Sequence, residues 1–164
     1  MINKNPLLLF LFLGIIFSQC SSSDPVEKDL LNYINNELPK IGQLESEAIA
    51  AYASVSGNNY TSDSVMYFKI KDEVLPKYTE FNSKLQAIVP ATEELKKIHG
   101  EYVEAAKDQL EAFTFIVDAL IKQNADEIQK ANVDLSKGVA LIETWKKDLL
   151  ETCKKHNVVI GDKK

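Results

Sequence analysis

The chain has 164 residues, of which 45% are hydrophobic and 26% are charged, a composition that suits one folded domain. All 19 basic residues are Lys, against 24 Asp and Glu, so the formal net charge is −5. Without Arg, phosphate and carboxylate groups cannot be bound by a bidentate guanidinium. An acidic chain with no basic stripe also lacks the electrostatic footprint of a nucleic-acid-binding protein. We therefore expect no nucleic-acid partner.

The first residues are typical of an export signal. Lys4 precedes an apolar run of eleven residues, Leu7 to Phe17. As a helix this run is about 16 Å long, whereas a membrane-spanning helix needs about 20 residues. The run is therefore predicted to be the hydrophobic part of a signal peptide covering residues 1–19. Ser18, Gln19 and Cys20 follow, and then a polar stretch from Ser21 to Asp24.

This arrangement resembles the lipobox of bacterial lipoproteins, in which a diacylglycerol is attached to the cysteine and the signal peptide is cut off before it. The resemblance covers about the first 24 residues and implies lipidation of Cys20, with residues 20–24 as anchor and short linker. Phe17 stands where Leu is commonest and Gln19 where Gly, Ala or Ser is usual, so the box is a relaxed one. The alternative is an ordinary secretory signal with an incidental cysteine.

The resemblance also implies a location. The protein is expected in the cell envelope, held on a membrane by acyl chains on Cys20 and facing the periplasm or the exterior. In a Gram-negative envelope, Ser21 resembles the pattern that sorts lipoproteins to the outer membrane. The mature chain has 18 Lys against 24 Asp and Glu, a formal charge of −6.

The first predicted helix begins at Pro25, with Asp24 as its cap and Glu27 in its first turn. It ends before Gly57. Apolar residues recur along it at steps of three and four, which marks one helical face: Leu30, Ile34, Leu38, Ile41, Leu44, Ala48, Tyr52 and Val55.

Three further helices follow the same pattern. The second begins near Ser62 or Asp63 and stops at Pro90, and the third opens at Thr92. Asn124 caps the fourth, which Asn157 closes. No stretch alternates at period two for long enough to predict a strand. We therefore predict an all-α fold, an antiparallel up-down four-helix bundle over residues 25–157 with a tail at 158–164.

Two prolines fall inside these helices, where a proline removes a hydrogen bond and costs about 3 kcal/mol. Pro39 and Pro76 occur in similar phrases, Glu-Leu-Pro-Lys and Val-Leu-Pro-Lys, at nearly equal distances from the turn at Gly57. In an antiparallel hairpin they would stand at about the same height, which predicts two matched kinks. The alternative is that each proline breaks its helix, giving six shorter helices.

One set of residues suggests a metal site. Cys153 and His156 are three residues apart and share a helical face, and His99 lies early in the third helix, near them in an antiparallel pair. Together they would suit Zn²⁺ or copper. The plainer interpretation is that Cys153 is a small core residue and His156 a cation at a helix C-terminus. The spacings for a di-iron site or a c-type haem are absent from the sequence.

No catalytic motif is present: the sequence has no Gly-rich phosphate loop and no nucleophile elbow. The acidic groups at Glu45-Ser46-Glu47, Asp72-Glu73 and Glu93-Glu94 are interpreted as solvated helix faces. We therefore expect no enzymatic activity. Cys153 has no intramolecular disulfide partner once Cys20 is acylated, which predicts that its thiol is buried or bonds to another chain.

Phe115 is the one hint of a contact surface. It falls about 200° round the helix from Phe113, on a face shared with Asp108, Glu111 and Asp118. Such a ring can contact a partner or simply be a lone exposed aromatic. The leading hypothesis is therefore a non-enzymatic envelope lipoprotein that binds an unknown envelope protein, with metal or small-ligand binding inside the bundle as the alternative.

Overall fold

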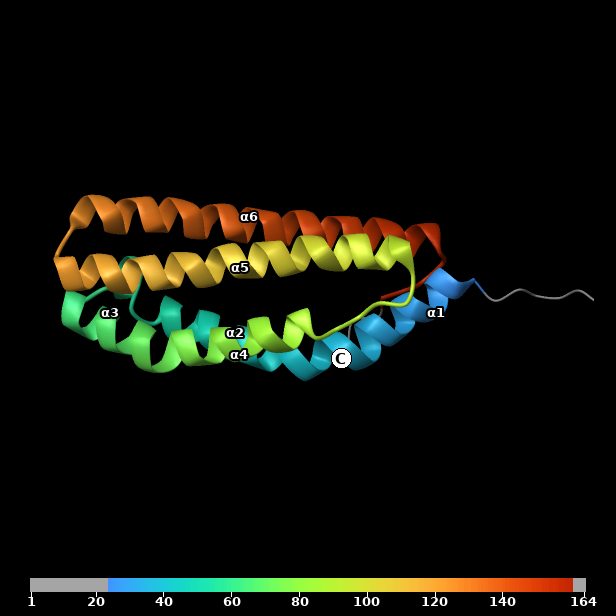
Figure 1. Ribbon diagram of the computed structural model, residues 1–164, viewed down its shortest axis with the longest axis horizontal. Helices are drawn as coiled ribbons and strands as arrows, with labels where there is room; N and C mark the ends of the chain where they lie inside the picture. The colour runs from blue at the N-terminus through green and yellow to red at the C-terminus, as the bar shows by residue number, and fades with distance from the viewer. Residues whose placement is uncertain (1–23, 161–164) are drawn as a thin grey trace, which may run out of the picture.

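A computed structural model describes residues 24–160, which are helical almost throughout and contain no strand. They form four helical segments joined by short connections (Figure 1). The predicted all-α class is therefore confirmed. No helix within 24–160 is long and apolar enough to cross a membrane. The predicted signal peptide and Cys20 lie outside the described residues.

The first segment comprises α1 (Pro25–Asn32), a π-helical turn η1 (Tyr33–Glu37) and α2 (Leu38–Ala53). Its predicted cap is confirmed, because the Asp24 carboxylate accepts a hydrogen bond from the backbone N–H of Val26 at 2.9 Å. A 3-10 turn η2 (Gly57–Asn59) leads out of it, with Gly57 at φ 58°. Glycine adopts this left-handed conformation without steric cost.

The second segment is likewise two α-helices joined by a π-helical turn. Its elements are α3 (Asp63–Lys69), η3 (Ile70–Val74) and α4 (Leu75–Gln86). Ser62 caps it by accepting from the backbone N–H of Val65. Helical backbone continues through both prolines, from Pro25 to Ala53 and from Asp63 to Gln86.

Each proline lies two residues after the last residue of a π-helical turn. The Leu38 N–H donates to Tyr33 five residues back, and the Leu75 N–H donates in the same way to Ile70. In a regular α-helix, the residue after each leucine would donate its N–H to the carbonyl four residues back. Proline has no N–H, and its ring would clash with that carbonyl. The wider turn removes both conflicts, so the same local solution is used twice.

The last two helices are the longest, α5 (Glu93–Lys122) and α6 (Ala125–Lys155). Asn124 caps α6 as predicted, accepting from the backbone N–H of Glu127 at 3.2 Å. The two helices lie side by side along their length (Figure 1). Ion pairs join them at both ends, Lys122 with Glu127 at 3.0 Å and Lys155 with Glu94 at 2.8 Å.

The core consists of the apolar stripes of all four segments. Its largest fully buried hydrophobic side chains are Tyr33, Tyr78, Phe81, Phe113, Leu30 and Ile70. The expected tail starts inside this core: Val158 is buried, and its N–H donates to the Cys153 carbonyl at 2.8 Å across the left-handed residue Asn157. This arrangement closes the C-terminal end of α6.

Helix α6 lies close against α5 at Gly138. A Cβ atom placed there would lie 2.6 Å from Gln109 Cγ and 3.4 Å from the Ala105 carbonyl oxygen. Gln109 is itself buried and bonded, because Tyr78 OH donates to its Oε1 at 2.8 Å. The side chain that would have to move is therefore held in place, and residue 138 must be glycine for this approach.

We expect Gly138→Ala to destabilise the fold by about 1–3 kcal/mol, because the added methyl overpacks this contact. Gly42→Ala is the matched control, since nothing lies within 4 Å of a Cβ there. That control should gain about 0.5–1 kcal/mol from the better helix former. Urea unfolding of both variants measures the difference; equal stabilities would contradict the close approach.

Candidate functional site: a groove between α2 and α6

Helix α6 packs along α5, while α2 packs against α4 and makes little direct contact with α6. A groove of about 620 Å³ lies between α2 and α6. Its α2 wall includes Leu38, Gly42, Ile49 and Ala50, and its α6 wall includes Val139 and Ile142. Near the α2–α3 end of the molecule, the two walls meet where Tyr52 OH donates to Asn132 Oδ1 at 3.2 Å.

An aromatic pair forms the floor of the groove. The rings of Tyr102 and Trp145 are stacked, with centroids 3.8 Å apart and planes 15° apart. Tyr102 OH donates to Glu45 Oε2 at 2.7 Å. Trp145, the only tryptophan in the chain, has a buried Nε1 with no acceptor. Such an unmet donor costs about 1–3 kcal/mol.

Glu45 is the unusual residue of this groove. Burial raises the pKa of its carboxyl, and the hydrogen bond from Tyr102 and the charge of Lys146 only partly oppose that effect. Glu45 was expected on a solvated helix face, and the structure corrects this interpretation: its side chain is half-buried at the groove floor. The helical spacing of the sequence did indicate burial of Glu45, since position 45 lies four residues after Ile41 and three before Ala48, both in the buried stripe.

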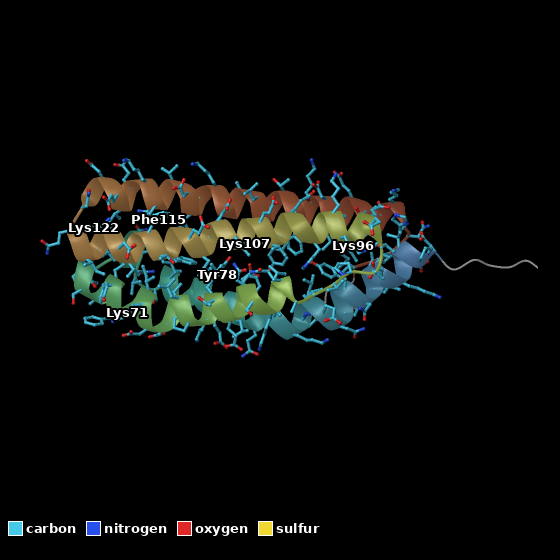
Figure 2. All side chains as sticks on the ribbon, viewed as in Figure 1. Lys71, Tyr78, Lys96, Lys107, Phe115 and Lys122 are labelled. Carbon is cyan, nitrogen blue, oxygen red and sulfur yellow. The ribbon has the colours of Figure 1, made fainter. Side chains whose placement is uncertain are left out.

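A second polar pair lies beneath the groove. Tyr78 points into the interior between α4 and α5 (Figure 2), where its OH donates to Gln109. Burial raises the pKa of Tyr78, so the phenol keeps its proton. Its ring also packs edge-on against Phe113 at 5.2 Å. Each polar pair of the groove floor therefore has an aromatic ring packed against it.

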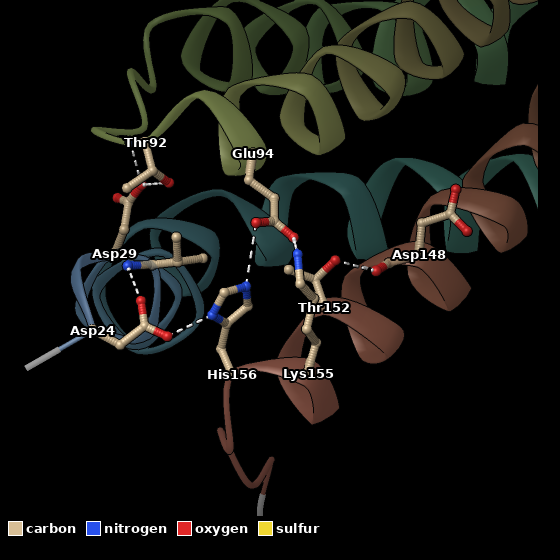
Figure 3. Close-up of polar contacts among 9 residues, drawn as sticks. Asp24, Asp29, Thr92, Glu94, Asp148, Thr152, Lys155 and His156 are labelled. Atoms are coloured by element: carbon tan, nitrogen blue, oxygen red, sulfur yellow. Dashed lines mark hydrogen bonds and ion pairs between the residues drawn. The ribbon is translucent and has the colours of Figure 1, made fainter.

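A different polar cluster ties together the end of the molecule where α1 begins (Figure 3). Asp29 of α1 accepts from the backbone N–H groups of Ala91 and Thr92, at 3.1 and 2.7 Å, and from Thr92 Oγ1 at 2.7 Å. The third helix was predicted to open at Thr92, and Thr92 is indeed the residue just before α5. Its side chain makes no capping hydrogen bond to the first turn of α5. A carboxylate from another helix therefore fixes the two residues that lead into α5.

His156 joins three helices in the same cluster (Figure 3). Its Nδ1 lies 2.5 Å from Asp24 Oδ2 at the start of α1, and its Nε2 lies 3.2 Å from Glu94 Oε2 on α5. The hydrogen bond to Asp24 is the main cause that raises the pKa of His156. The pKa of Asp24 is lowered mainly by this same bond, and that of Glu94 mainly by the bond from Lys155.

The three predicted metal ligands have other partners or none. His99 Nδ1 lies 3.0 Å from Tyr33 OH, and burial lowers the pKa of its ring while a hydrogen bond with the Leu85 backbone opposes this. Cys153 is a buried free thiol whose pKa burial raises. Between residues 24 and 160, no three His, Cys, Asp or Glu side chains are placed so that they could hold a metal ion. The structure therefore does not assemble His99, Cys153 and His156 into a site.

Phe115 projects from α5 with 58% of its surface exposed (Figure 2). It borders two shallow depressions between α5 and α6, of about 330 and 250 Å³. Their other lining side chains are mostly charged: Asp108, Glu111, Asp118, Lys122, Glu127 and Asp134. The predicted exposure of the ring is confirmed, but its surroundings are polar.

The His156 contacts predict a pH-dependent stability. The folded pKa of His156 is raised above its ordinary value of 6.5, so its contribution is complete below that value and is lost as pH rises through the folded pKa. Asp24 and Glu94 have lowered folded pKa values, so their contributions are lost only as the pH falls through those values. The contacts of His156 with Asp24 and Glu94 should therefore stabilise the folded protein most between about pH 5 and pH 6.

His156→Gln should flatten the fall in melting temperature that we expect of the wild type as the pH rises above about 6.5. Lys154→Gln, on the exposed side of the same helical turn, is the control and should keep the wild-type profile. Thermal unfolding across the pH series gives the answer. Parallel profiles for His156→Gln and wild type would contradict the assigned role of His156.

The chain was compared with family models, with curated proteins and with solved structures. No family model, no curated protein and no solved structure matches it significantly. The function proposed below therefore depends on the residues and contacts of this chain.

Proposed function

We propose that the protein is a non-enzymatic lipoprotein of the bacterial cell envelope whose helical domain holds a ligand in the groove between α2 and α6. One observation supports this most: the groove stays open although both of its walls are largely apolar. Covering apolar surface gains about 25 cal/mol per Å², so an occupant of the groove would be stabilised there. A volume of about 620 Å³ also lies within the roughly 300–1,000 Å³ of small-molecule sites.

The proposed anchor is Cys20, carrying acyl chains after removal of residues 1–19. One chain gives marginal membrane binding, whereas two or three hold a protein stably on a bilayer. Cys20 precedes Asp24, the cap of α1, by four residues, so the domain would work close to the lipid surface. In a Gram-negative envelope, Ser21 favours the outer membrane.

We also infer that the four segments run up-down-up-down and that the first hairpin bends at Pro39 and Pro76. Ion pairs at both ends of α5 and α6, and the packing of α2 on α4, support this arrangement. The π-helical turns before each proline support a bend at matched heights. A bend of that kind would carry α2 away from α6 and widen the groove.

Two further hypotheses have less support. Zn²⁺ or copper capture would need His99 and His156 to leave the hydrogen bonds that they make. A contact between Phe115 and an envelope protein is supported by the exposure of the ring alone. A single exposed aromatic side chain needs no partner to explain it.

The anchor is tested by metabolic labelling with radioactive palmitate. The wild-type chain should incorporate label and fractionate with membranes, whereas Cys20→Ala should lose both, because the acceptor thiol is gone. Cys153→Ala is the control and should label normally, since that thiol is buried. Unchanged labelling of Cys20→Ala would overturn the proposed lipidation.

The groove is tested by placing a photo-crosslinking amino acid at single positions of the full chain in its native envelope. Ser46, which lines the groove, should give an adduct, and Ser83 on the exposed face of α4 should not. A third position, Phe115, tests the aromatic contact. Mass spectrometry distinguishes a small-molecule adduct from a protein adduct. No adduct specific to Ser46 would overturn the proposed use of the groove.

A further inference from the structure

His99 of α5 lies buried where three parts of the fold meet, and only 7% of its surface is exposed. Its Nδ1 lies 3.0 Å from the hydroxyl of Tyr33, the first residue of η1. The two rings also pack edge to face, with their centroids 5.6 Å apart. The backbone of Leu85 on α4 interacts with the imidazole and favours its charged form, so it acts as an acceptor. His99 therefore links η1, α4 and α5.

These partners suit a neutral imidazole. A neutral ring has one nitrogen that donates and one that accepts. The Leu85 carbonyl can only accept, so it takes the N–H of the ring and leaves Nδ1 to accept from the Tyr33 hydroxyl. Burial raises the pKa of Tyr33, so its phenol keeps the proton that it donates. The uncharged ring therefore satisfies both of its neighbours.

A protonated ring would lack a counter-charge at this position. Within residues 24–160, no carboxylate is paired with His99, and Tyr33 is the side chain bonded to it. From α6, neither of the nearby titratable groups bonds to it: Cys153 is a free thiol, and His156 bonds to Asp24 and Glu94.

Protonation would also disturb the bond to Tyr33. Nδ1 would become a donor, so the Tyr33 hydroxyl would have to turn round and its own proton would lose its acceptor. A buried cation without a partner is strongly unfavourable. Burial accordingly lowers the pKa of His99. The folded packing around this ring is therefore compatible with its neutral form alone.

We propose that His99 is an acid-responsive switch: protonation of its buried ring displaces the Tyr33 side chain and loosens α1 and η1 from α4 and α5. Tyr33 is the part of the first segment that must move, because its hydroxyl and its ring both pack on His99. Since η1 leads directly into α2, whose first residue Leu38 lines the groove, the switch would also act on the α2 wall. The inference goes beyond the proposed ligand and holds whether or not the groove is occupied.

The direction of the pH effect follows from the lowered pKa. Because the folded pKa of His99 lies below its ordinary value of 6.5, the loosened state takes up the proton first as the pH falls. Below pH 6.5, each further pH unit should favour loosening by up to about tenfold, until the folded ring is itself protonated. The bonds of His156 to Asp24 and Glu94 are complete in this range, so they do not cause the effect.

The test follows amide hydrogen exchange of the full chain by mass spectrometry at a series of pH values, corrected for the intrinsic exchange rate. In the wild type, protection of residues 30–38 should fall by up to about tenfold per pH unit from pH 6.5 towards pH 5. The amides around Gly138 on α6 should keep their protection. His99→Gln should abolish the fall, because the glutamine amide does not titrate. His156→Gln removes the other histidine of the chain and is the matched control, which should retain the fall.

Three outcomes would overturn the proposal. An equal fall in the wild type and in His99→Gln would remove His99 from the effect. Loss of protection in all helices together would be a global destabilisation and not a local loosening. The third outcome comes from the wild type alone, so it remains decisive if His99→Gln does not fold: an NMR titration in which the His99 ring changes charge at pH 6.5 or above.

Discussion

Helix α6 packs along α5, while hydrogen bonds near its two ends join it to the first helical segment, and the rest of the architecture depends on this. At one end His156 reaches Asp24, and at the other Asn132 accepts from Tyr52. Gly138 allows the close approach that holds α6 on α5 between those ends. Because α6 packs mainly on α5, the apolar side chains at its remaining edge face α2 across the groove. The groove is thus a consequence of one very close helix pair.

Polar side chains from distant helices fix the end of the molecule where α1 begins, in addition to the local cap at Asp24. Asp29, on a helix far away in sequence, accepts hydrogen bonds from the backbone N–H groups of the two residues that precede α5. A carboxylate there also faces the positive end of the helix dipole. His156 and Glu94 add bonds at the same end. The segment behind the proposed lipid anchor is therefore joined to both long helices, so the anchor would hold the whole domain.

Glu45 shows why side chains in the groove were harder to predict than the helices. Its position near the buried stripe was visible in the sequence, but acidic neighbours such as Glu47 favoured a solvated face. Only the placement of Tyr102 opposite it provides the donor that lets a carboxyl be half-buried. Pairings of this kind join residues 57 positions apart in the chain, which periodicity within one helix cannot report.

The sequence by itself determined the helical class, the approximate limits of the four helical segments, the caps at Asp24 and Asn124, and most of the buried stripes. These features depend on contacts within a few residues, which spacing and residue type encode directly. The tertiary structure decided which helices touch. It gave His99 and His156 separate hydrogen-bond partners and left α2 apart from α6. Those outcomes depend on the shapes of distant side chains meeting in space, as where Gly138 makes room for Gln109.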